Sequence, residues 1–317
     1  MNAFKWLLKR EFWEHKGAFF WTPIAIGAIL VLLAAVSMLF GVLGLSNGMQ
    51  INGLTVTNLA EVITPQLKTQ FASSLVLAYV GFLIPFSIAF AFCVFFFCTG
   101  ALYDDRKDRS VLFWKSLPLS DHATVLSKVV MAIGVAPMIA LLVSTIAAMV
   151  TALLTCLAAA AAGANMFGAV LSNPATYLAP LQIAAMLPIY ALWALPAIGW
   201  LLMVSAWARS KPFLWAVGVP MMAGVLVSWS SRAFQLDLNT TWLWKNIIGR
   251  LLGSVMPGSW FSAQAGAFQS EAPASALGEM LTHSWQLLAS ANIWIGAALG
   301  AAMIYAAIRL RGNRDEG

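Results

Sequence analysis

Long apolar stretches alternate with short polar segments along this chain. Each of the six longest stretches holds about 20 or more mostly apolar residues, the length that crosses a bilayer as a helix. They cover about residues 19–45, 74–100, 124–156, 178–207, 213–232 and 290–310. Several exceed the minimum length, so we expect tilt or extension beyond the bilayer. The pattern predicts an all-α integral membrane protein with six transmembrane helices.

Composition supports this class and argues against a soluble one. The chain is 61% hydrophobic and 9% charged, and its mean hydropathy is +0.83, whereas about a quarter of the residues in a soluble domain are charged. The net charge of +6 would suggest nucleic-acid binding in a soluble protein, but here it reflects basic loops on one side of the membrane. We therefore expect no nucleic-acid partner and one transmembrane domain over 1–317.

The positions of Lys and Arg predict the orientation. With the N-terminus inside, most of them fall in cytoplasmic segments, and the outer segments hold only Lys68, Arg232, Lys245 and Arg250. Cytoplasmic loops carry an excess of basic residues, so both termini are expected in the cytoplasm of a multi-pass protein of the cell membrane.

One further apolar segment lies in the outer region 233–289. Residues 241–261 are apolar enough to resemble a seventh span, but Lys245 and Arg250 interrupt them and Pro257 with Gly258 ends them early. A seventh span would also place the basic C-terminus outside. We expect a re-entrant or interfacial helical element before the sixth span.

The N-terminal residues 1–18 predict a helix at the membrane surface. On a helical wheel three lysines form one stripe and tryptophans flank it; the anchor residues are Lys5, Trp6, Lys9, Trp13 and Lys16. Lysine can extend to lipid phosphates while tryptophan lies at the level of the head groups. Glu11 and Glu14 interrupt the apolar face, so a solvated extension of the first span remains the alternative.

Several kinds of chemistry have no sequence support. No Gly-Lys dipeptide occurs, so no Walker A loop is present to bind ATP. The three histidines are far apart, and the three cysteines lie inside apolar runs. The spans are nearly free of charge, which argues against an ion-coupled carrier and a membrane-embedded metalloenzyme. We predict no catalytic, cofactor-binding or metal-binding residues in this chain.

Proline and glycine suggest where the spans bend and touch. Proline removes a backbone donor and kinks a helix. The candidate hinges are Pro180, Pro188, Pro196 and Pro220, although such kinks are also ordinary in membrane helices. Gly296 and Gly300 in the last span allow close helix approach, to a helix of the same chain or of a second copy.

The loop at 101–122 concentrates charge between the second and third spans. It contains "DDRKDR" at 104–109, where Asp104 or Asp105 is a plausible N-cap and Asp105 can pair with Arg109 four residues on. Phe113 and Trp114 follow, and Pro118 ends the predicted short helix. The aromatic side chains fit either the membrane interface or a groove on a partner protein.

This loop resembles the first cytoplasmic loop of ABC-2 type permeases, the membrane subunits of ATP-driven exporters. The family pairs an acidic residue with Arg after the second span, then has a Ser-Leu-Pro element and a Lys at the third span. The matching residues are Asp105, Arg106, Ser116, Leu117, Pro118 and Lys128. The six-span layout, the N-terminal helix and the outer element agree with the family, whereas the density of charge at 104–109 departs from it.

The resemblance implies a function and partners. The loop would carry a coupling helix that docks on a separate ATPase subunit, two copies per transporter, which binds ATP and Mg²⁺. The permease would pair with a second permease chain, expected to be identical, in a bacterial inner membrane. It would also contact the lipids of that membrane. The substrate would be amphipathic, lipid-like or a peptide. The implied coupling residues are Asp104, Asp105, Arg106, Arg109, Phe113, Trp114, Leu117 and Pro118.

Two other functions remain open. A membrane enzyme acting on lipid or prenyl substrates could use acidic residues at 104–109 to bind Mg²⁺, although the interleaved basic residues weaken cation binding. A membrane assembly factor without transport activity is the second alternative.

Overall fold

The computed structural model describes residues 3–46, 49–51, 54–56, 64–108, 120–263 and 273–313. It is almost entirely helical, with one short hairpin and a few π-helical or 3-10 turns (η). The elements are α1 (Ala3–Glu14), η1 (Gly17–Trp21), α2 (Thr22–Ser46), β1 (Met49–Ile51), β2 (Leu54–Val56), α3 (Pro65–Gly100), α4 (Tyr103–Lys107), α6 (Asp121–Val130), η3 (Met131–Val135), α7 (Ala136–Ala161), α8 (Phe167–Leu171), α9 (Pro174–Ala184), α10 (Leu187–Trp207), α11 (Pro212–Ala233), α12 (Thr240–Leu243), η4 (Trp244–Ile248), α13 (Gly249–Gly253), α14 (Ser259–Ala263), α15 (Pro273–Gln286), η5 (Leu287–Ala289) and α16 (Ala291–Asn313).

Among the residues that the structure describes, six helical segments are long and apolar enough to cross a membrane, and their number agrees with the prediction. They are Gly17–Gly44, Tyr79–Lys107, Asp121–Ala161, Pro174–Trp207, Pro212–Ala233 and Ala291–Gly312. Helices satisfy their own backbone hydrogen bonds, so they are the structure that such apolar stretches adopt in lipid. Side chains that would be buried in a soluble protein are exposed on these helices, as expected for surfaces that face hydrocarbon.

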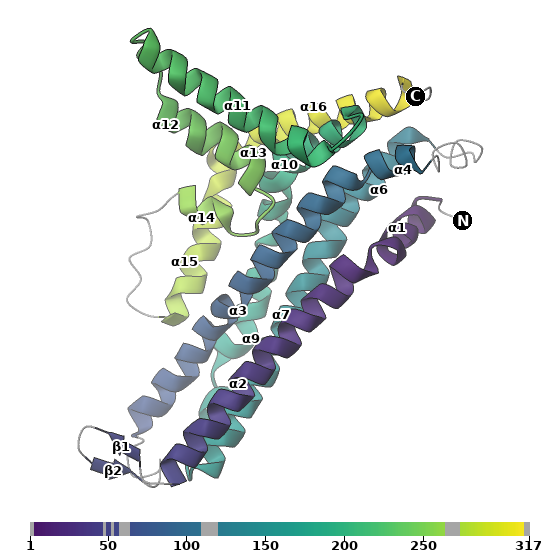
Figure 1. Cartoon of the computed structure of the whole chain (residues 1–317). Coiled ribbons are helices and arrows are strands. Elements are labelled where there is room, and N and C mark those ends of the chain that lie inside the picture. Colours follow the sequence, from purple (N-terminus) through teal and green to yellow (C-terminus); the bar gives the residue numbers. More distant parts are fainter. Residues whose placement is uncertain are drawn as a thin grey trace.

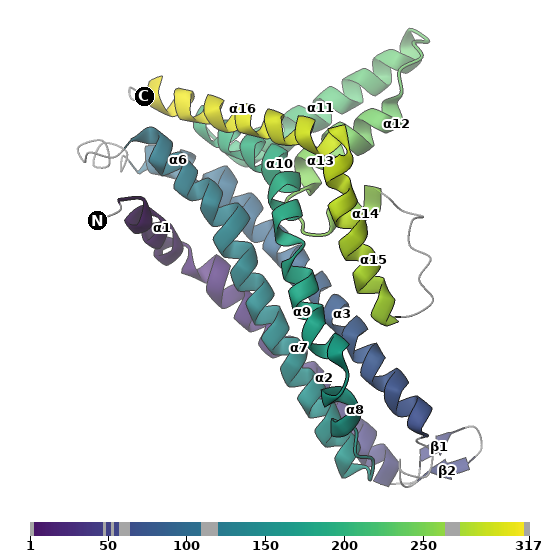
Figure 2. The ribbon, with the colours of Figure 1, turned by 180° about the vertical axis from the view of Figure 1, so that it is seen from behind.

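The long helices α2, α3 and α7 lie side by side, with α2 and α3 both packed on α7 (Figures 1 and 2). The β1–β2 hairpin lies at one end of this layer, where Met49 pairs with Val56. The start of α1, the end of α16, α4 and the start of α6 lie at the opposite end (Figure 1). We call the first of these the hairpin end and the second the charged end, because Asp105, Lys128 and Arg311 lie at the second.

Helices α10 and α16 form the closest helix pair. A Cβ added at Gly300 would lie 2.6 Å from the Leu195 carbonyl oxygen and 2.7 Å from the Pro196 nitrogen. A Cβ at Gly199 would lie 2.5 Å from the Gly300 carbonyl oxygen. The glycine of the last span thus allows close approach to a helix of the same chain, which resolves the alternative left open by the sequence.

The fourth span is two helices rather than the single one that was predicted. Helix α9 ends at Ala184 and α10 begins at Leu187, with a turn between them. Pro188 lies in the first turn of α10, where its missing N–H has no intrahelical partner to lose. Of the other hinge candidates, Pro180 lies inside α9, Pro196 inside α10 and Pro220 inside α11.

The segment after α11 folds back along it in short pieces (Figure 1). The Trp244 indole Nε1 donates a hydrogen bond of 2.9 Å to the Ser228 Oγ of α11. Helix α13 ends at Gly253, and the chain then turns through Pro257 and Gly258 (φ +83°). No piece of the described region 240–263 reaches the length of a seventh span.

Candidate functional site

A buried cluster of ion pairs lies at the charged end of the helices. The Lys128 ammonium of α6 is 3.1 Å from Oε1 of Glu11 in α1 and 3.5 Å from Oδ2 of Asp105 in α4. The same Asp105 oxygen accepts a hydrogen bond of 3.4 Å from Arg311 Nη1 in α16. Glu11, Lys128, Asp105 and Arg311 are all nearly excluded from solvent. Four elements that are far apart in the sequence are joined by these contacts.

Two partly exposed residues complete this ion-pair cluster. Arg311 Nε donates to Asp121 Oδ1 at 3.0 Å, which holds the end of α16 against the start of α6. The Arg10 guanidinium lies 3.8 Å from Asp105 Oδ1 and 3.2 Å from Glu14 Oε2. Charges removed from water are tolerated only when partners compensate them. The cluster meets this condition, because each buried charge has an opposite charge within 4 Å.

Helices α4 and α10 cap each other beside this cluster. The Ser205 Oγ of α10 accepts hydrogen bonds of 3.0 Å from the backbone N–H groups of Leu102 and Tyr103, at the start of α4. In return, Arg106 of α4 donates from Nη2 to the Ser205 and Ala208 carbonyl oxygens, at 2.6 and 3.0 Å. Each helix therefore satisfies end groups that the other would leave unpaired.

This mutual cap corrects the predicted local geometry of the loop. Asp104 and Asp105 do not cap α4, because its N-cap residue is Leu102 and the accepting side chain comes from Ser205. Asp104 is exposed, Asp105 is buried in the ion-pair cluster, and Arg106 is turned toward α10. The remaining coupling candidates, Arg109, Phe113, Trp114, Leu117 and Pro118, lie outside the described residues, as does Ser116.

Helix α1 has two distinct faces. The five anchor residues predicted from the sequence, Lys5, Trp6, Lys9, Trp13 and Lys16, are all exposed. The Lys9 and Lys16 ammonium groups lie 5.1 and 5.5 Å from the ring centres of Trp6 and Trp13. Leu7 and Glu11 face inward. The exposed face has the composition of a surface that lies at lipid head groups.

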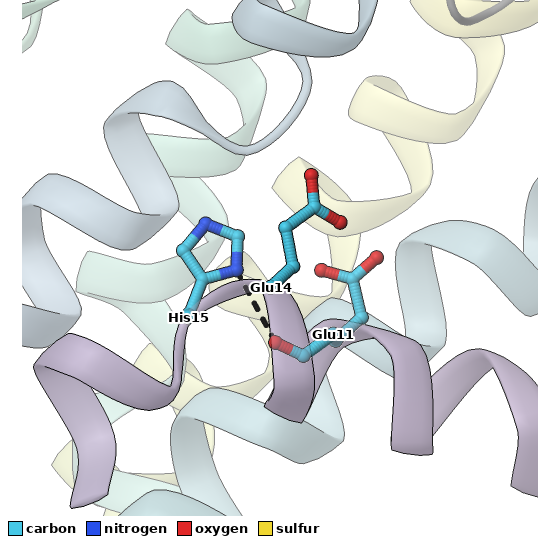
Figure 3. Close-up of side chains that lie close together, drawn as sticks. All are labelled: Glu11, Glu14 and His15. Carbon is cyan, nitrogen blue, oxygen red and sulfur yellow. Dashed lines mark hydrogen bonds between the residues drawn. The ribbon is translucent and has the colours of Figure 1, made fainter.

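Glu11, Glu14 and His15 are the described residues closest to a metal-binding arrangement, shown in Figure 3. The His15 ring uses Nδ1 to donate to the Glu11 backbone oxygen at 3.2 Å. The Glu11 carboxylate already has the Lys128 ammonium at 3.1 Å and Arg10 at 3.9 Å. These cations repel a further cation, so this donor set does not fit a metal ion.

An apolar groove lies between the helices, away from the ion-pair cluster. It has a volume of about 390 Å³, and α3, α7, α9, α10, α15 and the chain from Met256 to Phe261 form its walls. Ile84 lines it and is itself about half exposed, so the groove is open to the surroundings at that point. The Tyr190 hydroxyl is engaged, because it donates to the Val255 carbonyl oxygen at 3.1 Å.

Sequence reasoning missed part of the ion-pair cluster. In the sequence, Glu11 only interrupts the apolar face of the N-terminal helix, and Arg311 is one of several basic residues near the C-terminus. The signal available was an acidic residue on an apolar helix face, which requires a buried cation as its partner. The sequence does not identify that partner, because Lys128 is 117 positions from Glu11.

Comparison of the chain with models of protein families, with curated proteins and with solved structures finds no significant match.

Proposed function

We propose that this chain is the permease subunit of an ABC-2 type exporter. It would work with a second copy of itself and two copies of a separate ATPase in a bacterial inner membrane, with both termini in the cytoplasm. The proposal rests on the resemblance of the 101–128 region to that family and on the six helices that can cross a membrane.

One observation carries this proposal beyond the general class of membrane proteins. The segment that enters the charged loop, α4, is fastened to the spans at two places: Asp105 to α6 and α16, and Arg106 to α10. A loop attached in this way transmits a displacement to several spans at once, because packed helices move as rigid bodies. A loop whose basic residues served only to keep it on the cytoplasmic side of the membrane would need no such attachment.

The distribution of charge agrees with transport that is driven by a separate ATPase subunit and not by ions that bind within the spans. Among the described residues, the buried ion pairs all lie at the charged end. The groove between the spans is lined mainly by apolar side chains. An apolar groove suits an amphipathic or lipid-like substrate, whose chain prefers to leave water.

The test is co-purification from native membranes with mass spectrometry. We expect an ATPase with a Walker A motif to accompany the wild-type chain. The disrupting variant reverses two exposed charges of α4, Asp104→Lys with Lys107→Glu, and a second variant is Trp114→Ala in the loop. Both should lose about tenfold or more of the ATPase, as expected when interface anchor residues are removed.

The matched control is Lys245→Glu, which reverses an exposed charge in η4. It should retain the ATPase. Arg106→Ala is unsuitable as the main variant, because Arg106 caps α10 and its removal disturbs the fold. Absence of any ATPase from the wild-type sample would contradict the proposal and favour an enzyme or an assembly factor.

A further inference from the structure

Arg250 of α13 forms no ion pair with any carboxylate among the residues that the structure describes. Its Nη1 donates to the Asn292 carbonyl oxygen at 2.7 Å, near the start of α16. Its Nε and Nη2 are buried and have no hydrogen-bond partner. Burial lowers the pKa of the Arg250 guanidinium from its ordinary value. Buried donors are almost always paired in folded proteins, so these two call for an explanation.

The position of this guanidinium is enforced by its neighbours. It lies over the Trp193 ring of α10, 4.4 Å from the ring centre. On its other side is Gly296 of α16, where an added Cβ would lie 2.8 Å from Nη1. The guanidinium therefore lies between the Trp193 ring and the Gly296 position of α16.

Trp193 links Arg250 to the apolar groove. The Trp193 Nε1 donates a hydrogen bond of 3.1 Å to the Ser259 Oγ, and Ser259 lines the groove. The polar edge of the groove at Ser259 is therefore separated from the guanidinium by a single indole ring. Because Arg250 is partly buried, its charge is screened less than that of a fully exposed arginine and can act across this short separation.

We propose that the groove binds the apolar chain of an anionic amphiphile, whose head group lies at the Ser259 edge and is attracted by Arg250. This inference rests on the proposed export function, of which it names the substrate class. The recognised chemistry is a phosphate or carboxylate joined to a hydrocarbon chain. The apolar walls select the chain, and the unmatched positive charge selects the anion over a neutral or cationic head group.

The test uses the full chain in phosphatidylcholine nanodiscs without ATPase. Two photo-activatable probes carry the reactive group at the tail: a dodecyl phosphate and the corresponding dodecanol. We expect both to label the groove segments of α3 and α7, with half-saturation for the phosphate at about tenfold lower concentration, which corresponds to about 1.4 kcal/mol of attraction to the anion. Equal half-saturation, or labelling confined to other segments, would overturn the proposal.

Two pairs of variants separate the head group from the chain. Arg250→Gln should abolish the preference for the phosphate probe, whereas Arg250→Lys, which keeps the charge, should retain it. Ala140→Phe fills the groove and should reduce labelling by both probes, whereas Leu142→Phe, on the exposed side of α7, should not. An unchanged preference in Arg250→Gln would contradict the role of Arg250.

Inorganic phosphate distinguishes a free anion from an amphiphile. If the chain supplies part of the affinity, inorganic phosphate should not displace the dodecyl phosphate at equal concentration. Full displacement would identify a simple anion site and overturn the proposal. Since no ATPase takes part, positive labelling in a chain that recruits no ATPase would leave this binding site in place and refute only the exporter.

Discussion

At the scale of single residues, the paired charges Glu11 and Lys128 determine how α1 lies on the spans. Both side chains are buried, and their atoms approach to 3.1 Å. Such a pair adds little net stability over a well-packed apolar pair, but removing one partner leaves an uncompensated charge. The pair therefore requires that α1 and α6 meet in one register.

Replacing Lys128 by Met should strongly destabilise the protein. The variant leaves buried Glu11 with only the Arg10 guanidinium at 3.9 Å, whereas Asp105 keeps Arg311 and Arg10, so we expect a cost of about 3 kcal/mol, the lower end for a broken buried ion pair. We expect a clear drop in the thermal unfolding midpoint of the detergent-solubilised chain. Lys107→Met, at an exposed position of α4, is the matched control and should change stability by no more than about 0.5 kcal/mol.

A double variant tests whether charge compensation is the reason. Glu11→Gln together with Lys128→Met removes one anion and one cation, so it should recover part of the stability lost in Lys128→Met alone. Strictly additive losses would show that the pair does not act as a unit.

At the scale of elements, the mutual cap between α4 and α10 should behave as one cooperative contact. Ser205→Ala removes the acceptor of two backbone N–H groups, and Arg106→Ala removes the donor to two carbonyls. Each change should cost about 1–2 kcal/mol. A double-mutant cycle on thermal stability should yield an interaction energy of about 1 kcal/mol, whereas Arg209→Ala paired with Ser205→Ala should give none.

The contact of α10 with α16 depends on Gly300. Gly300→Ala would place a Cβ 2.6 Å from the Leu195 carbonyl oxygen, and backbone cannot move aside cheaply. We expect destabilisation of about 3 kcal/mol, at the upper end for overpacking, seen as a broadened size-exclusion peak. Gly218→Ala in α11, which has open space around the position, should leave the peak sharp.

At the scale of the whole molecule, the described chain ends lie together at the charged end (Figure 1). If that end is cytoplasmic, fluorescent protein fused at the C-terminus should fluoresce, and alkaline phosphatase fused there should be inactive. Phosphatase inserted after Asp237, in the exposed turn beyond α11, should be active. An insertion after Arg209 should again behave as cytoplasmic. An active phosphatase at the C-terminus would require a different number of crossings.

Local pattern accounts for what the sequence determined by itself. The six spans follow from runs of about 20 apolar residues, because hydrocarbon leaves the backbone no partner outside its own helix. The exposed Lys and Trp face of α1 follows from the helical period in the same way. The break of the fourth span lies next to the predicted hinge Pro188, but the sequence did not distinguish a kink within one helix from two separate helices.

Only the tertiary structure decided which distant groups meet. Lys128 reaches Glu11, Arg106 turns from the loop to cap α10, and Gly300 packs on α10 rather than on another surface. A buried charge or an unpaired helix end requires a partner, but any residue of suitable chemistry could be that partner. Which one does so depends on how the helices cross, and that is determined by packing along their entire length.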